Sequence, residues 1–241
     1  KRALLLEAIM AEQIELSVLF GPNALTIFPA EYDDLHNGID MLIEFAQEKE
    51  ESEDFEYLAL GVDITSSAKN LGKKLGIIKD GILKGTLSQM TYFYSERSKK
   101  EKPLKFNIPK VVIGIERQAI QELSGLWLEA HQAKLNAHDK TLSEESRKHQ
   151  QERAKNALRA LAEHRVRYLI LEEIKMQLIA FHKFAKEKNQ TQVAVKLSAT
   201  LDLIKSILSS KEVPSKDVLF QNQEDRVFQS MTEELNDFDN L

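Results

Sequence analysis

Hydrophobic residues in the first part of the chain follow two different periods. Residues 2–20 carry leucine and isoleucine at helical spacing until Gly21, Pro22 and Asn23 interrupt them, which predicts a first helix. Three stretches rich in β-branched and aromatic residues come next, separated by turn-forming or acidic residues: 24–28, 38–45 and 57–65. We expect them to be successive strands of one antiparallel sheet.

The helical period returns after residue 65 and then gives way to strands again. A serine pair that can cap a helix precedes four apolar residues on one helical face, and Gly85 ends the pattern: Leu71, Leu75, Ile78 and Leu83. Residues 91–94 and 110–115 have the pattern of two further strands, and the second is dense in β-branched residues, as a central strand would be. The order α-β-β-β-α-β-β predicts a mixed α/β fold of the α+β type.

Beyond residue 115 the patterns are helical. Three segments follow one another: 116–137, 143–189 and 191–209. The apolar positions of the long middle segment gather in its C-terminal half. We therefore expect its N-terminal half, 147–167, to extend from the core as an arm.

The last part of the chain is acidic and weakly periodic. Residues 211–241 carry only isolated apolar anchors, which predicts a tail that docks locally or stays disordered. The patterns divide the chain into an α/β core at 1–125, a helical extension or arm at 126–210, and this tail.

The composition narrows the possible chemistry. None of the 241 residues is cysteine, which excludes disulfides, thiolate nucleophiles and Cys-based zinc sites, and suits a reducing, cytoplasmic location. No apolar run approaches the ~20 residues of a membrane span, so we expect no membrane partner. The sequence also has no glycine-rich phosphate loop, no Gly-x-Ser-x-Gly elbow and no His-Glu-x-x-His motif, which removes support for nucleotide hydrolysis, esterase chemistry and zinc proteolysis.

The distribution of charge bears on partners. A net charge of −5 argues against a protein that coats nucleic acid by bulk electrostatics. Basic residues nevertheless gather on the long helical segment, where they form either a track for a phosphate backbone or an ordinary solvated face: Arg147, Lys148, Arg153, Lys155, Arg159, Arg165 and Arg167. Residues 143–189 are also the candidate surface for a protein partner or for self-association into a homo-oligomer.

Two carboxylates interrupt strands that otherwise consist of core residues. Asp40 lies in Gly-Ile-Asp-Met-Leu-Ile, and Asp63 lies in Leu-Gly-Val-Asp-Ile-Thr. An ionised carboxylate is costly to enclose unless it is paired or binds a cation. On adjacent antiparallel strands, the two side chains are expected to face each other within reach of one metal ion.

In these residues and in the order of its elements, the chain resembles the PD-(D/E)XK nuclease superfamily. That family has a helix, a three-stranded meander, a crossover helix and a further strand. Its signature is an acidic residue on the second strand, followed on the third strand by the motif Asp or Glu, then any residue, then Lys. Here those positions hold Asp40 and Asp63-Ile64-Thr65, so threonine stands where lysine is expected. The resemblance covers residues 1–115.

The resemblance implies a Mg²⁺- or Mn²⁺-dependent hydrolase that cleaves phosphodiester bonds in DNA or RNA. It assigns the metal to the carboxylates of Asp40 and Asp63, to the carbonyl of Ile64 and to Glu7 on the first helix. It also implies that a lysine on the following helix replaces the one missing at Thr65. Lys69 and Lys73 are the candidates for this catalytic role.

Structural alternatives exist for each of these residues. Asp63 precedes a helix and can cap it, and Asp40 can bond to the turn that precedes its strand. Glu31, Asp33 and Asp34 have the pattern of an exposed acidic loop. The alternative function is a non-enzymatic interaction protein, in which a degenerate nuclease-like core anchors the long helix that binds a partner.

Overall fold

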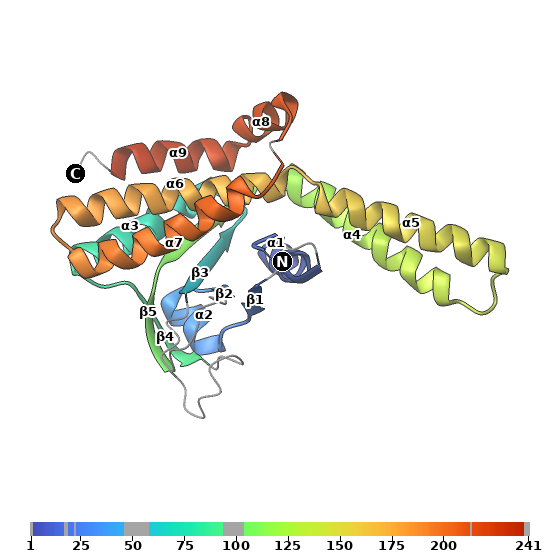
Figure 1. Ribbon diagram of the computed structural model, residues 1–241, viewed down its shortest axis with the longest axis horizontal. Helices are drawn as coiled ribbons and strands as arrows, with labels where there is room; N and C mark the ends of the chain where they lie inside the picture. The colour runs from blue at the N-terminus through green and yellow to red at the C-terminus, as the bar shows by residue number, and fades with distance from the viewer. Residues whose placement is uncertain are drawn as a thin grey trace.

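The computed structural model describes residues 2–16, 19–21, 23–45, 58–93, 104–212 and 214–238. Within these residues the protein is mixed α/β, with a mixed sheet followed by a long helical region, which confirms the predicted fold class. Figure 1 shows a body built of the sheets and most of the helices, from which one pair of helices projects.

The main sheet contains both antiparallel and parallel neighbours. Its strands lie in the order β1 (Ala24–Ile27), β2 (Met41–Phe45), β3 (Leu58–Thr65) and β6 (Lys110–Gly114). The first three form the predicted antiparallel meander, and β6 joins parallel to β3. Parallel neighbours require a crossover. It begins with the 3₁₀ turn η1 (Ala68–Asn70) and helix α3 (Leu71–Leu83), whose buried face ends at Ile82, whereas the predicted Leu83 is exposed.

The acidic cluster before β2 is a helix, α2 (Glu31–Asn37), and the prediction of an exposed loop was wrong. Acidic residues in its first turn favour the N-terminus of a helix, and Gly38 ends it in the left-handed conformation at φ 59°. Asp33 is fully buried, and its carboxylate accepts a hydrogen bond from the Thr91 N–H at 2.9 Å. Because Gly38 caps this helix, β2 begins at Met41 rather than at residue 38.

A second, two-stranded sheet lies beside the first. It pairs β4 (Ser88–Phe93) with β5 (Leu104–Ile108), and residue 94 of the predicted strand lies outside the described residues. The sequence did not predict β5, because Pro109 alone separates it from β6 and the two resemble one strand introduced by a proline. This hairpin contributes Met90 and Ile108 to a small core with Ile39 and Leu42.

The larger core lies between the main sheet and the helices α1 (Arg2–Leu16), α3, α6 (Val166–Glu187) and α7 (Thr191–Ser209). Helix α6 also protects the outer edge of β6. The Gln177 side chain accepts a hydrogen bond from the Val112 N–H at 2.8 Å and donates one to the Val112 carbonyl at 2.6 Å. Glu173 accepts from the Gly114 N–H at 3.0 Å. Side chains of a helix thus take the hydrogen-bonding role of a further strand.

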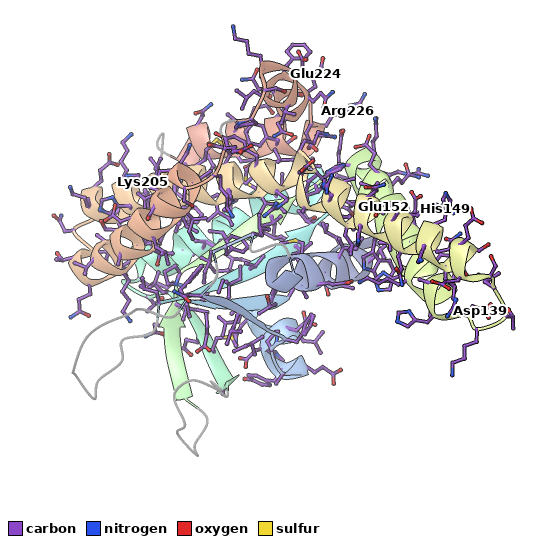
Figure 2. The ribbon with its side chains drawn as sticks, turned by 45° about the vertical axis from the view of Figure 1, so that its right-hand side comes forward. Asp139, His149, Glu152, Lys205, Glu224 and Arg226 are labelled. Atoms are coloured by element: carbon purple, nitrogen blue, oxygen red, sulfur yellow. The ribbon has the colours of Figure 1, made fainter. Side chains whose placement is uncertain are left out.

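The projecting pair consists of α4 (Arg117–His138) and α5 (Glu144–Ala162), which form an antiparallel hairpin. Figure 2 shows Asp139 at its tip and Glu152 and His149 along its length. The two helices meet through small residues, which allow close approach: Ala130, Ala133, Ala137, Ala154 and Ala157 are buried. The arm is therefore a two-helix unit and not the single helix predicted.

The predicted helix 143–189 is broken between α5 and α6. The guanidinium of Arg167 donates to the Ala162 carbonyl at the end of α5, and the His164 ring accepts from the Val166 N–H at 3.3 Å at the start of α6. Leu161 and Val166 are both buried on either side of the break. No glycine or proline marks this position, which explains why the periodicity alone missed it.

The acidic tail is ordered into α8 (Lys216–Gln223) and α9 (Arg226–Phe238). Helix α9 packs on α3 and α6, and its apolar face is buried: Val227, Met231, Leu235 and Phe238. Of the two predictions for the tail, local docking rather than disorder is therefore correct for residues 216–238. Among the described helices none is long and apolar enough to cross a membrane.

Candidate functional site

Asp40 and Asp63 meet where β2 begins and β3 ends. The register pairs Met41 with Val62, so the next residue outward on each strand brings Asp40 opposite Asp63. The Asp40 N–H donates to the Val62 carbonyl at 2.9 Å, and the Asp40 Oδ2 accepts from the Ile64 N–H at 2.5 Å. The proposed alternative, in which Asp40 bonds to the preceding turn, is replaced by this contact across the strands.

The Asp63 carboxylate forms an ion pair with the ammonium group of Lys74, through its Oδ1. The Asp63 side chain is only 7% exposed and that of Lys74 24%, so this pair is largely shielded from water. Asp63 does not cap the next helix. Instead the Thr65 hydroxyl accepts from the Ser67 N–H at 3.2 Å, so Thr65, where the resemblance predicts a lysine, helps to shape the turn.

Lys74 was not among the lysines that the sequence singled out. Lys69 on η1 and Lys73 on α3 are both exposed, and of the lysines in the described ranges it is Lys74 that pairs with Asp63. The reason is helical phase, because Lys74 follows the buried Leu71 by three residues and precedes the buried Ile78 by four. Lys73 lies about 100° away from this direction. The spacing from Leu71 was the signal that points to Lys74.

A second lysine, Lys110, belongs to the site and was missed. It is the first residue of β6, opposite Gly61, and is 5% exposed. Its ammonium donates to the carbonyl of Asn37 at 3.0 Å and to that of Gly38 at 3.5 Å. Burial lowers the pKa of Lys110, whereas the negative charge of Asp63 raises it. A charged residue inside an apolar strand was the same signal that identified the two aspartates.

The two carboxylates differ in their electrostatic environment. Burial raises the pKa of Asp40 from its ordinary 3.8 to about 6, and the charges of Asp63 and Glu7 act in the same direction. The hydrogen bond from Ile64 and the positive charge of Lys74 oppose this rise. A carboxyl whose pKa is raised by burial and by neighbouring negative charges is typical of functional sites.

Glycine is required beside these groups. A Cβ atom on Gly38 would lie 3.4 Å from the Asp63 Oδ2 and 3.5 Å from the Lys110 Nζ, and the residue has a positive φ. A larger side chain would enter the space that Asp63 and Lys110 share. The positive φ favours glycine at this position, and the Asp63 and Lys110 side chains both approach it closely.

Glu7 is near this site but does not complete a metal cage. It lies on α1 and is half-buried, and burial, followed by the charge of Asp34, raises the pKa of its carboxyl. Within the ranges described above, no group of three Asp, Glu or His side chains is placed to hold a metal ion. The predicted four-ligand set is therefore not assembled. Glu7 flanks the helix face that buries Leu6 and Ile9, which holds it beside the carboxylate pair.

Several of the basic residues between positions 147 and 167 lie beside acidic neighbours. Lys148 pairs with Glu144 at 2.9 Å, and Arg153 pairs with Glu129 at 3.0 Å. Arg165 lies 3.8 Å from carboxylate oxygens of both Glu116 and Glu122. This pattern favours an ordinary solvated face over a continuous track for phosphates.

Comparisons with protein families, with curated proteins and with solved structures find no match for this chain.

Proposed function

We propose that this protein is a metal-dependent phosphodiester hydrolase that acts on DNA or RNA. The observation that carries the proposal is that Asp40, directly before β2, lies opposite Asp63 on β3, with the ammonium of Lys74 bound to Asp63. Two carboxylates and a lysine that converge in a shielded position are the groups that metal-assisted phosphate hydrolysis requires. The cysteine-free sequence suits action in the cytoplasm.

The arrangement of the elements supports the resemblance to PD-(D/E)XK nucleases. A helix precedes an antiparallel meander, Asp40 directly precedes its second strand and Asp63 lies on its third, and β6 pairs with β3 after a crossover. The signature lysine is absent at position 65, where the chain has threonine, but Lys74 on α3 supplies an ammonium group beside Asp63. The chain therefore retains the chemical groups of the family signature at altered positions.

The donor atoms fit a hard divalent cation. Asp40 Oδ2 and Asp63 Oδ1 accept the hydrogen bonds described above, and the second oxygen of each carboxylate is the one that would hold Mg²⁺ or Mn²⁺. Mg²⁺ is commonly bound by one or two carboxylates and keeps several waters, so a third carboxylate is not essential. When bound, such an ion polarises a phosphate and lowers the pKa of a coordinated water. A role for the Ile64 carbonyl stays a prediction.

The two lysines have different tasks in this proposal. Lys74 is partly exposed and holds a positive charge beside Asp63, where it can stabilise the negative charge that develops on a phosphate. Lys110 is buried and binds the carbonyls of Asn37 and Gly38. It thereby fixes the turn that leads into Asp40. We assign Lys74 to the reaction and Lys110 to positioning.

The proposal is tested by cleavage of plasmid DNA and of single-stranded RNA with Mg²⁺ or Mn²⁺. We expect metal-dependent cleavage by the wild type, loss of cleavage in EDTA, and loss in Asp63→Asn, which keeps the shape but removes the charge that holds the ion. Asp202→Asn, which changes an exposed aspartate on α7, is the matched control. Equal cleavage by wild type and Asp63→Asn would overturn the assignment.

The alternative, a non-enzymatic interaction protein, is supported by the projecting hairpin. Leu128 and Leu135 lie two turns apart on α4 and are 60% and 69% exposed. We take a second copy of the chain as the partner to test, by analytical ultracentrifugation of the wild type and of a Leu128→Ser, Leu135→Ser variant. Self-association that this variant abolishes, together with no cleavage on either substrate, would favour the alternative.

A further inference from the structure

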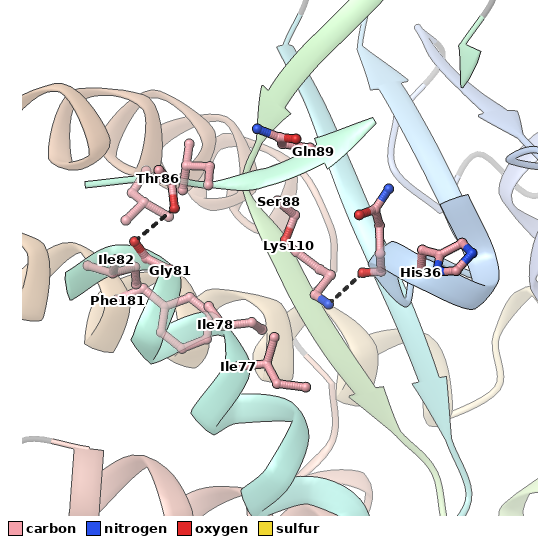
Figure 3. A pocket seen from close by; sticks show the side chains of 13 residues that line it. His36, Ile77, Ile78, Gly81, Ile82, Thr86, Ser88, Gln89, Lys110 and Phe181 are labelled. Atoms are coloured by element: carbon pink, nitrogen blue, oxygen red, sulfur yellow. Dashed lines mark hydrogen bonds between the residues drawn. The ribbon is translucent and has the colours of Figure 1, made fainter. Parts of the chain in front are cut away.

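A cavity of about 200 Å³ lies between α3, α2 and the start of β4 (Figure 3). Its walls are apolar and come from three helices: Ile77, Ile78, Ile82, Phe181 and Leu197. Polar groups line the remaining side, namely His36, Ser88, Gln89 and the ammonium end of Lys110. Ile77, one of the lining residues, is 56% exposed.

The dimensions of this cavity limit what it can accept. Pockets for drug-sized ligands span roughly 300–1,000 Å³, and this one is smaller. It therefore suits a single flat ring system rather than an entire nucleotide. Apolar walls with polar groups on one side match the faces and the edge of a heteroaromatic ring.

The cavity is adjacent to the carboxylate pair. Helix α3 presents Lys74 to Asp63 and, three and four residues later, presents Ile77 and Ile78 to the cavity. Four residues correspond to a distance of about 6 Å along a helix. Lys110 links the two places, because it lines the cavity while its Nζ and the Asp63 Oδ2 both lie beside Gly38.

We infer that this cavity binds one unpaired nucleobase of the nucleic-acid strand whose phosphate lies at Asp40 and Asp63. The inference rests on the proposed function and specifies its substrate as single-stranded or locally unpaired nucleic acid. A base inside a duplex is stacked and cannot enter a closed pocket unless it leaves the stack. The isoleucine side chains contact the ring faces.

Lys110 supplies a polar contact for such a base. An ammonium has three N–H donors, and the carbonyls of Asn37 and Gly38 accept two of them. The third can donate to a ring carbonyl or to a purine N7, which are the atoms that lysine recognises on guanine. Ser88 and Gln89 add hydroxyl and amide groups on the same side.

The test is ligand-observed saturation-transfer NMR without divalent metal, so that it does not depend on cleavage. The probes are AMP, GMP, CMP and UMP, with ribose 5-phosphate as the control that lacks a base. We expect the nucleotides to bind at least about tenfold more tightly than ribose 5-phosphate, because a stacked base contributes this much or more. Ser88→Trp, whose indole fills the cavity, should abolish the difference.

Two further variants complete the design. Leu83→Trp places the same side chain at an exposed position of α3 outside the cavity and should bind as the wild type does. If Ser88→Trp does not fold, Ile77→Ala removes part of the apolar wall and should weaken nucleotide binding about threefold or more. Equal binding of nucleotides and ribose 5-phosphate, or unchanged binding in both cavity variants, would overturn the inference. Cleavage that persists in that case would leave the proposed function standing.

Discussion

Lys74 on α3 holds the Asp63 carboxylate at the end of β3 in an ion pair, eleven residues away in the sequence. In the proposed function, this lysine of the crossover helix takes the role of the one expected at position 65. An ammonium beside a metal-binding carboxylate is placed to neutralise charge on a phosphate that approaches the ion.

Lys74→Met should therefore reduce the rate of metal-dependent cleavage by about 10²-fold or more, the loss typical of removing one group that stabilises transition-state charge. Lys69→Ala and Lys73→Ala are the matched controls, since both lysines are exposed. Single-turnover rates on an oligonucleotide substrate measure the effect. A control variant that lost as much activity as Lys74→Met would refute the assignment.

Cleavage should depend on pH through Asp40. Its carboxyl has a pKa of about 6, so it is largely protonated at pH 5 and largely ionised at pH 7. Because the ion requires the charged form, the rate at limiting Mg²⁺ should rise with pH through this range. Saturating Mg²⁺ should shift the midpoint to lower pH, since metal competes with the proton. A profile that is flat between pH 5 and 7 would contradict this role.

Asp40→Asn should make the protein more stable while it removes activity. The folded state raises the pKa of Asp40 from 3.8 to about 6, so the wild type loses stability as pH rises through this interval. Asparagine can keep the bond from the Ile64 N–H without this loss. At pH 7 we expect a gain of about 1–2 kcal/mol, reduced from the full shift because solvent screens a partly buried carboxyl. Urea denaturation at pH 4 and pH 7 checks it, with the gain confined to pH 7.

Gln177→Ala should destabilise the sheet edge. It leaves the buried N–H and carbonyl of Val112 without their partners, which should cost about 2–4 kcal/mol in the free energy of unfolding. Gln190→Ala is the control, because its bond to the Leu83 carbonyl is exposed and its loss should change stability by less than about 0.5 kcal/mol. Equal denaturation midpoints for the two variants would show that α6 does not stabilise this edge.

The sequence predicted those elements and residues that a local pattern, such as hydrophobic periodicity, is enough to identify. The meander, α3 and α7 follow from periodicity, and Asp40 and Asp63 stand out as charges within apolar strands. Lys74 and Lys110 were not predicted, although Lys74 shares the helical phase of Leu71 and Ile78, and Lys110 begins an apolar strand. The break at residues 163–165 depends on contacts of Arg167 and His164 that form only in the folded chain.

Local sequence patterns also cannot predict hydrogen bonds between residues that are far apart in the chain. Glu173 and Gln177 appear as ordinary polar residues of a helix, yet both are fully buried against β6. Their role depends on the placement of α6 along a sheet edge that lies some 60 residues earlier in the chain. Burial raises the pKa of Glu173 well above its ordinary value, an effect that only the assembled fold produces.

The central claim, that Asp40 and Asp63 form a working metal site, is tested most directly by a crystal structure of the protein soaked in Mn²⁺ and measured for anomalous scattering. We expect a manganese peak bound by both carboxylates, at the oxygen distances of ~2.1 Å typical of small divalent cations, and no such peak in Asp63→Asn crystals. A wild-type structure with saturating Mn²⁺ and no peak at these carboxylates would contradict it.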